Sequence, residues 1–181
     1  MNREEGLELV SSKVKNDRLV KHMLAVEAVM RGVARRLGED EDRWGLAGLI
    51  HDLDYDETAK TPEQHGKVGA EYLRQLGVDE DIVRAVESHV GLISRDTPME
   101  KALYAADPLT GLVVAAALMH PSKRLSGLDV EFVLNRFKEK RFAAGADRGQ
   151  IRSCEGFGID LEEFVGIVLK SMQDISDTLG L

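Results

Sequence analysis

The apolar residues of this chain recur with the spacing of α-helices, and no stretch shows the alternation of a half-buried strand. The clearest case starts at Asn16 or Asp17, either of which can cap a helix, and stops near Gly38. Its inward positions follow steps of three and four: Leu19, Met23, Val26, Val29 or Met30, Val33 and Leu37. The pattern predicts an all-α bundle of about eight or nine helices.

The same periodicity places the other helices. We expect them at about 4–15, 40–51, 62–76, 79–93, 99–106, 109–119, 129–140, 146–154 and 161–179. Pro62 suits the first turn of its helix, which would then hold His65. Asp107-Pro108 is expected to end the helix before it. With no linker or repeat between these segments, residues 1–181 are predicted to form one domain.

Composition narrows the functional classes. The formal charge of −8 argues against a nucleic-acid polymer as partner, although a metal site can supply local positive charge to a small anion. A single cysteine, Cys154, excludes an internal disulfide and suits a reducing cytoplasm. The N-terminus lacks the apolar core of a signal peptide, and the uncharged run 108–122 is too short to span a bilayer. We therefore expect a cytoplasmic protein with no membrane partner.

A histidine and an aspartate, His51-Asp52, stand at the end of an apolar run. Charged side chains at such a place are rarely buried without a partner. No lysine or arginine occurs between Arg43 and Lys60. Imidazole with carboxylate is a ligand pair suited to zinc, iron or manganese, so the pair predicts a metal site.

Helical spacing places further polar side chains on the apolar faces of the expected helices, which point toward the core. The full set of candidates is His22, His51, Asp52, His65, His89 and Asp107. Each histidine taken singly is more often a hydrogen-bonded core residue than a ligand. For Asp107 alone, a helix end before proline is as good an interpretation as a ligand. A shared metal accounts better for the set, because four histidines recur with two aspartates that have no evident basic partner.

The order of these six residues resembles the HD-domain superfamily of metal-dependent phosphohydrolases, in its six-ligand HDIG-type form. The local sequences resemble the HD-domain symmetrical dinucleoside-tetraphosphatases at residues 65–70, 88–91 and 100–107. The likeness covers roughly residues 17–112. It implies a single all-α HD-domain bundle with a core at about 17–120 and extra C-terminal helices at about 121–181.

The resemblance also implies a ligand arrangement for two divalent ions, with iron or manganese expected first and zinc, cobalt or magnesium as alternatives. One ion would take His22, His51, Asp52 and Asp107. The other would take His65, His89 and the second oxygen of Asp52, so Asp52 and His65 are the expected catalytic residues. Two such ions about 3.5–4 Å apart can hold a bridging water and clamp a phosphoryl oxygen. The implied reaction is hydrolysis of a small phosphoester, in particular a nucleotide, by a metal-bridging hydroxide.

The chain departs from that family beside the predicted site. Acidic Asp54 and Asp56 follow the His-Asp pair where a lysine is expected, and the residues after Asp107 are apolar. The two acids are expected to disfavour a chain of phosphates relative to a monophosphate. The candidates for binding the substrate are the basic residues Arg18, Lys21, Lys67 and Arg95.

Two other functions stay open on the same residues. Some proteins of this fold use the ligands with two irons and oxygen, which makes a di-iron oxygenase the first alternative. A catalytically silent sensor domain is the second, although such a domain has no need to keep six polar groups at inward positions. The sequence does not determine the substrate, the metal or the oligomeric state.

Overall fold

The computed structural model describes residues 1–181 and is helical throughout, with no strand, which confirms the predicted fold class. The N-terminal two thirds contain α1 (Arg3–Lys13), α2 (Asp17–Leu37), α3 (Glu41–Ile50), α4 (Tyr55–Thr58), α5 (Lys67–Gln75), α6 (Glu80–Ser88) and α7 (Pro98–Met119). The remainder contains α8 (Val130–Lys138), α9 (Arg148–Arg152), α10 (Leu161–Asp174) and α11 (Ser176–Leu179). Short 3-10 turns lie at Pro62–Gln64, Leu125–Gly127 and Ser153–Phe157. The count exceeds our expectation because one-turn helices such as α4 and α11 are too short to show a period.

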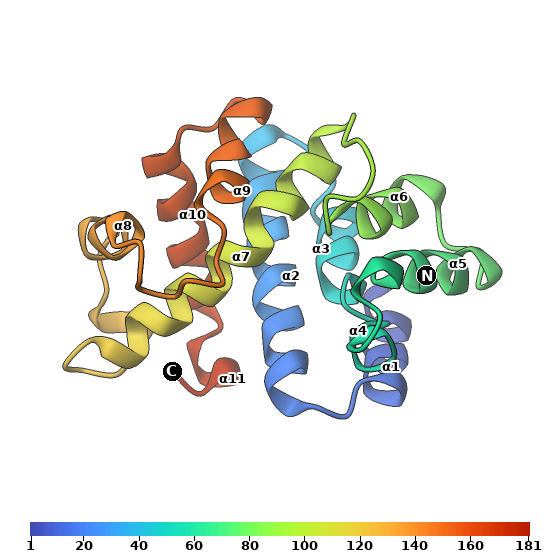
Figure 1. Ribbon diagram of the computed structural model, residues 1–181, viewed down its shortest axis with the longest axis horizontal. Helices are drawn as coiled ribbons and strands as arrows, with labels where there is room; N and C mark the ends of the chain where they lie inside the picture. Colours follow the sequence, from blue (N-terminus) through green and yellow to red (C-terminus); the bar gives the residue numbers. More distant parts are fainter.

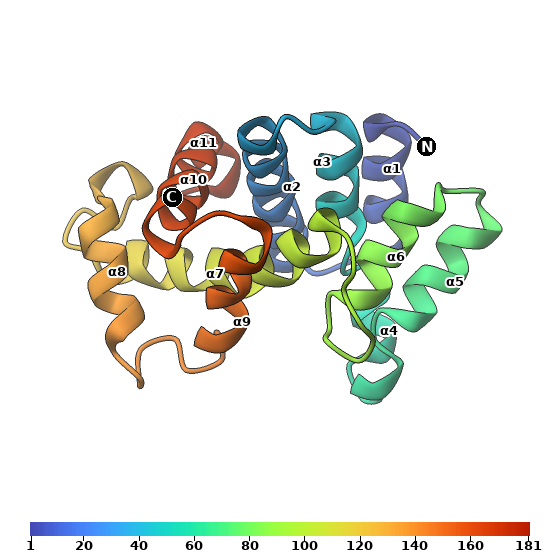
Figure 2. The same ribbon diagram turned by 90° about the horizontal axis from the view of Figure 1, so that it is seen from above.

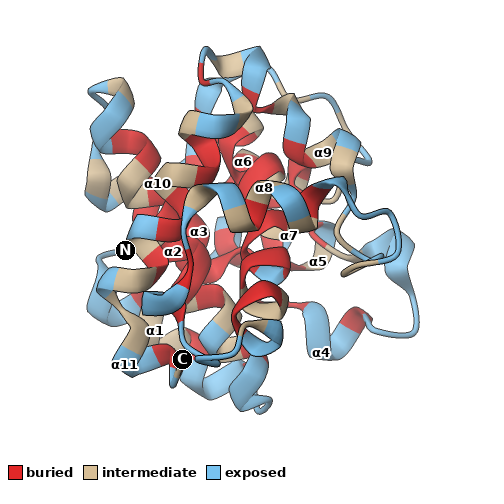
Figure 3. Cartoon of the chain, turned by 90° about the vertical axis from the view of Figure 1, so that its left-hand side faces the viewer, coloured by how far each residue is buried: buried red, intermediate tan, exposed pale blue.

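Three helices form the centre of the molecule. Helices α2 and α3 lie side by side, and α7 runs across them (Figures 1 and 2). Helices α1 and α4–α6 lie toward one end of the molecule and α8, α10 and α11 toward the other, while α9 packs against α7 between them (Figure 2). Burial is concentrated on α2, α3, α6 and α7, where these groups meet (Figure 3).

Helix α2 begins and ends as its sequence predicts. The side chain of Asn16 accepts a hydrogen bond from the Arg18 amide, and Gly38 ends the helix with φ +76°. Its contact with α3 is close, because a Cβ on Gly48 would lie 2.8 Å from the carbonyl oxygen of Val26. This close approach brings the C-terminal end of α3 against the middle of α2.

Helix α7 corrects one expectation. Asp107-Pro108 does not end a helix, and α7 continues through Pro108 to Met119. The local preference against helix before proline is overridden by burial, since the side chains of Leu103, Leu109 and Leu112 are all inaccessible to solvent. Helix α7 is long and apolar enough to cross a bilayer, as the core helices of many globular proteins are. Of its most apolar 18 residues, 56% are buried inside the protein.

The segment before α5 corrects a second expectation. Pro62 begins only a 3-10 turn, and His65 lies between this turn and α5 instead of in the first turn of a helix. Gly66 takes φ +78°, a conformation that residues with a side chain rarely adopt. The turn at Gly66 redirects the chain, so that His65 faces the end of α3.

Candidate metal centre

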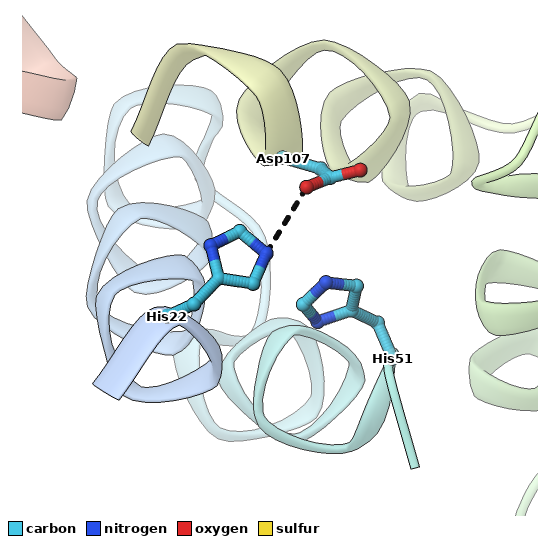
Figure 4. A group of neighbouring side chains, drawn as sticks. All are labelled: His22, His51 and Asp107. Atoms are coloured by element: carbon cyan, nitrogen blue, oxygen red, sulfur yellow. Dashed lines mark ion pairs between the residues drawn. The ribbon is translucent and has the colours of Figure 1, made fainter. Parts of the chain in front are cut away.

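The structure brings all six predicted ligands together. His22 comes from α2, His51 and Asp52 from the end of α3, and Asp107 from the middle of α7. His65 precedes α5 and His89 follows α6. Figure 4 shows the side chains of His22, His51 and Asp107 pointing toward one another from three helices, with the His22–Asp107 ion pair dashed.

Asp52 lies at the centre of the cluster, and its two carboxylate oxygens face different histidines. Oδ2 is 3.6 Å from Nε2 of His22 and 3.4 Å from Nε2 of His51. Oδ1 is 3.1 Å from Nε2 of His65 and 3.4 Å from Nε2 of His89. Asp107 joins the first group, with its Oδ1 3.1 Å from Nε2 of His22.

These separations have the size expected for atoms that share an ion. Donors about 2.0–2.2 Å from a divalent ion, at tetrahedral or octahedral angles, lie roughly 3–3.5 Å from one another. His22, His51 and Asp107 form one group of potential ligand atoms within 4.8 Å of one another, and His51, Asp52 and His89 form a second. Because Asp52 has an oxygen on each side, the geometry offers two adjacent positions that share one carboxylate.

Local structure fixes the ring orientation of His51 and His89 in the same way. Each residue is the C-cap of its helix, α3 or α6. Nδ1 of His51 donates to the carbonyl oxygen of Gly48 at 2.8 Å, and Nδ1 of His89 donates to that of Val86. Carbonyls in the last turn of a helix lack a partner within the helix, so they are available for these bonds. With the proton on Nδ1, each Nε2 presents a lone pair to Asp52.

His65 is oriented by Asp54, a buried acid. Its Nδ1 lies 2.8 Å from Oδ1 of Asp54. Oδ2 of Asp54 accepts from the amides of Gly66 at 2.9 Å and Gly69 at 2.8 Å, which are at the N-terminus of α5. The approach to Gly69 is close, because a Cβ there would lie 3.3 Å from the carboxyl carbon of Asp54. One carboxylate therefore caps α5 and holds His65 toward Asp52.

Nδ1 of His22 is also held by a protein oxygen, that of the Thr110 hydroxyl. The hydroxyl of Thr110 donates to the carbonyl oxygen of Asp107 at 2.8 Å, and its oxygen lies 3.2 Å from Nδ1 of His22. Since the hydroxyl proton is used on the carbonyl, the oxygen accepts from Nδ1 of His22. All four histidines thus have Nδ1 engaged by the protein and Nε2 directed at the carboxylates, the arrangement typical of metal-ligating histidines.

No lysine or arginine forms an ion pair with Asp52 or Asp107, whose partners are all histidines. Nε2 of His51 is buried and has no hydrogen-bond partner, a costly arrangement that a cation would relieve. Burial alone would raise the pKa of Asp52, but His51, His65 and His89 outweigh it and hold that pKa well below its usual range. Burial opposes protonation of His65, but Asp52 and Asp54 raise its pKa to about 9. These groups fit a divalent ion, which takes the place of the protons that they otherwise compete for.

The cluster opens into a cleft with a volume of about 950 Å³. Its floor contains His22, Asp52, His65, His89 and Asp107. The other lining residues are Asn16, Arg18, Leu19, Tyr55, Pro62, Glu63, Val90, Leu92 and Gln150. A small molecule therefore has access to the predicted ligands from one side.

The structure separates the candidates for substrate binding. Arg18 lines the cleft, whereas Lys21, Lys67 and Arg95 do not. Nζ of Lys21 donates to the carbonyl oxygen of Leu179 at 3.0 Å. The guanidinium of Arg95 stacks 3.8 Å from the ring centroid of Tyr104. Lys67 is exposed at the start of α5.

The two acids after the His-Asp pair also have other positions than we expected. Asp54 is 3% exposed, and its charge is used on His65 and two backbone amides. Asp56 is exposed and lies 3.2 Å from the amide of Lys15, outside the cleft. Neither carboxylate lines the cleft, so the predicted repulsion of polyphosphates by these residues has no structural basis.

Sequence reasoning missed two contributors. Thr110 was hidden in an apolar run, although it lies three residues after Asp107, which places it on the same side of a helix. Gln150 comes from α9, and no signal in the sequence connects it with residues more than forty positions earlier.

Residues 19–117 match the family described as HD domain. Among similar proteins, ribonuclease Y 2 of Levilactobacillus brevis is 26% identical over 157 residues, which cover 87% of this chain and 27% of that protein. Ribonuclease Y of Thermotoga maritima is 29% identical over 133 residues, 72% of this chain and 26% of that protein. An uncharacterized protein of Methanocaldococcus jannaschii is 28% identical over 134 residues, 69% of this chain and 78% of that protein.

The chain spans about a quarter of the length of these two ribonuclease Y relatives. The HD match, in contrast, covers more than half of this chain. All six clustered residues fall inside the matched segment, and Gln150 falls outside it. The protein is therefore a member of the HD domain family, whose members are generally metal-dependent phosphohydrolases.

Proposed function

We propose that this protein is a two-metal phosphohydrolase acting on a small phosphoester, in particular a nucleotide. The observation that carries the proposal is the position of Asp52, whose two oxygens face separate pairs of Nε2 atoms at 3.1–3.6 Å. Divalent ions held there would lower the pKa of water and polarise a phosphoryl oxygen. The expected occupants are iron or manganese, with zinc, cobalt or magnesium as alternatives.

The protein's own residues have distinct roles in this proposal. Asp52 connects the two positions, and Asp54 keeps the Nε2 lone pair of His65 directed at it. Arg18 is the only basic residue of the cleft apart from the histidines, and it would bind the phosphate of the substrate. No serine, cysteine or threonine lines the cleft, so a covalent phosphoryl or acyl intermediate on such a side chain has no support.

The rim of the cleft favours a substrate with an apolar, planar group. Tyr55 is 47% exposed and Leu92 is 52% exposed, which places two large apolar side chains at the opening. A nucleobase can stack on the face of an exposed aromatic ring. Arg18 is balanced by Glu63 in the lining, so the cleft lacks the positive charge that a chain of phosphates requires. Both features support a nucleotide with few phosphates.

The test is phosphate release by protein stripped of metal and reloaded with manganese, iron, cobalt, zinc or magnesium. The substrates are nucleoside monophosphates, a dinucleoside tetraphosphate and a synthetic phosphodiester. Arg18→Ala should raise KM about 10-fold or more, because a hydrogen bond to a charged group contributes about 1.5–3 kcal/mol. Lys21→Ala is the matched control, since it removes a positive charge from the same helix outside the cleft.

Other outcomes of this test separate the alternatives. The names of the ribonuclease Y relatives make a phosphodiester in RNA the second substrate class, so a short RNA oligonucleotide belongs in the screen. Oxygen consumption with iron and no phosphate release would support the oxygenase. Absence of turnover with every metal and substrate would refute the hydrolase and leave a sensor domain.

A further inference from the structure

Helix α7 contains a proline directly after a predicted metal ligand. Pro108 has no amide hydrogen, so the carbonyl of Tyr104 loses the bond that the residue four positions later normally donates. The proline ring also crowds this carbonyl and tilts it away from the helix. A buried helix can continue through such a point only if the freed carbonyl finds another donor.

Gln150 supplies that donor from outside the helix. Its Nε2 lies 2.7 Å from the carbonyl oxygen of Tyr104. Gln150 belongs to α9, which packs against α7, and it also lines the cleft together with His22 and Asp107. The contact joins the C-terminal helices to the turn of α7 that presents Asp107.

We propose that Gln150 is a positioning residue that sets the conformation of α7 at Pro108 and thereby the direction of the Asp107 carboxylate. The inference rests on the proposed function only in treating Asp107 as a metal ligand. Asp107 lies between Tyr104 and Pro108 in sequence, so a change in the local bend moves its side chain toward or away from His22. The C-terminal helices then form part of the metal centre, although they lie outside the segment that matches the HD family.

The first arm of the test is the metal affinity of Gln150→Met, which keeps the length of the side chain and removes the donor. Isothermal titration of the metal-free protein with manganese should show about 10-fold weaker binding at one of the two positions, the usual scale for residues that orient ligands. Gln173→Met is the matched control. Gln173 Nε2 also donates to backbone carbonyls, those of Leu125 and Leu128, but far from the cleft.

The second arm is rescue by Pro108→Ala, which returns an amide hydrogen to the helix. The double variant Pro108→Ala, Gln150→Met should bind manganese more tightly than Gln150→Met, because the backbone amide of the introduced alanine can donate to the carbonyl of Tyr104. Equal or weaker binding by the double variant would overturn the proposal, as would wild-type affinity in Gln150→Met.

Hydrogen exchange of α7 provides a readout independent of metal and turnover. Amides within one turn of Pro108 should exchange faster in Gln150→Met than in the wild type, and unchanged exchange would refute the role of the contact. If the wild-type protein binds no divalent metal at all, the proposed function fails. The exchange measurement then decides alone whether Gln150 fixes this part of the helix.

Discussion

Replacing Asp54 by asparagine tests how the second metal position is built. Asp54 is buried, and its two oxygens have separate partners. Oδ1 faces Nδ1 of His65 at 2.8 Å, and Oδ2 accepts from the amides of Gly66 and Gly69. Asparagine has the same shape, so its oxygen can keep both bonds to the N-terminus of α5. Its amino group must then face His65.

In the neutral form of His65, which is the form that can bind a metal, the substitution should move the ring proton from Nδ1 to Nε2. The amino group of the new side chain can only donate, so Nδ1 of His65 becomes an acceptor and the proton moves to Nε2. Nε2 faces Oδ1 of Asp52 at 3.1 Å, where the lone pair for a metal is required. The fold is kept, because α5 retains its cap and no atom is added.

The expected loss of metal affinity in Asp54→Asn follows from the hydrogen bond that metal binding would break in this variant. To bind an ion through Nε2, His65 must return its proton to Nδ1, where two N–H groups would then face each other. One hydrogen bond is lost and a buried donor is left unsatisfied, at a cost of about 1–3 kcal/mol. That range corresponds to roughly 5- to 150-fold weaker binding.

Isothermal titration of metal-free protein with manganese measures the effect directly. The Asp54→Asn variant should weaken one binding step by this factor and leave the other near the wild-type value, since His51 and His22 do not contact Asp54. Asp56→Asn is the control, because Asp56 is exposed and contacts only the amide of Lys15. Two unchanged binding steps in Asp54→Asn would refute the role of the tautomer. Equal weakening of both steps would refute the division into two positions.

Three further predictions follow from the same geometry. Asp52→Ala should lose nearly all bound metal after dialysis, whereas His65→Ala should keep one ion, as measured by elemental analysis. Complete loss of metal in both variants would contradict a site with two metal positions. The pKa of His65 is raised to about 9 in the folded protein, so protonation of this ring stabilises the metal-free fold. This contribution to the free energy of unfolding is complete below about pH 6.5 and is lost as pH rises through 9. Metal binding needs the neutral ring, so titration in two buffers at pH 7.5 should detect about one proton released from His65, and the number should fall as pH rises through 9. Gly48→Ala should reduce the free energy of unfolding in urea by about 1–3 kcal/mol, because its Cβ would lie 2.8 Å from the oxygen of Val26; unchanged stability would contradict this close approach.

The sequence by itself determined the helical fold class and the six residues of the cluster. Periodicity identified α2 over its whole length, since apolar side chains every three or four residues have one buried face in any packing. His51-Asp52 was identifiable because a polar pair at the end of an apolar run, with no nearby basic residue, needs a partner. These are local properties of the chain, so they can be found without coordinates.

Tertiary structure decided the features that depend on contacts between distant segments. It carried α7 through Pro108, where burial and the donor from Gln150 outweigh the local preference for a break. It also placed Asp54, which we expected to repel phosphates from beside the site, in a buried position as the partner of His65. The same carboxylate can repel a substrate or orient a ligand, and only its position relative to other helices distinguishes these roles. Local sequence does not determine that position, because it results from the packing of the whole chain.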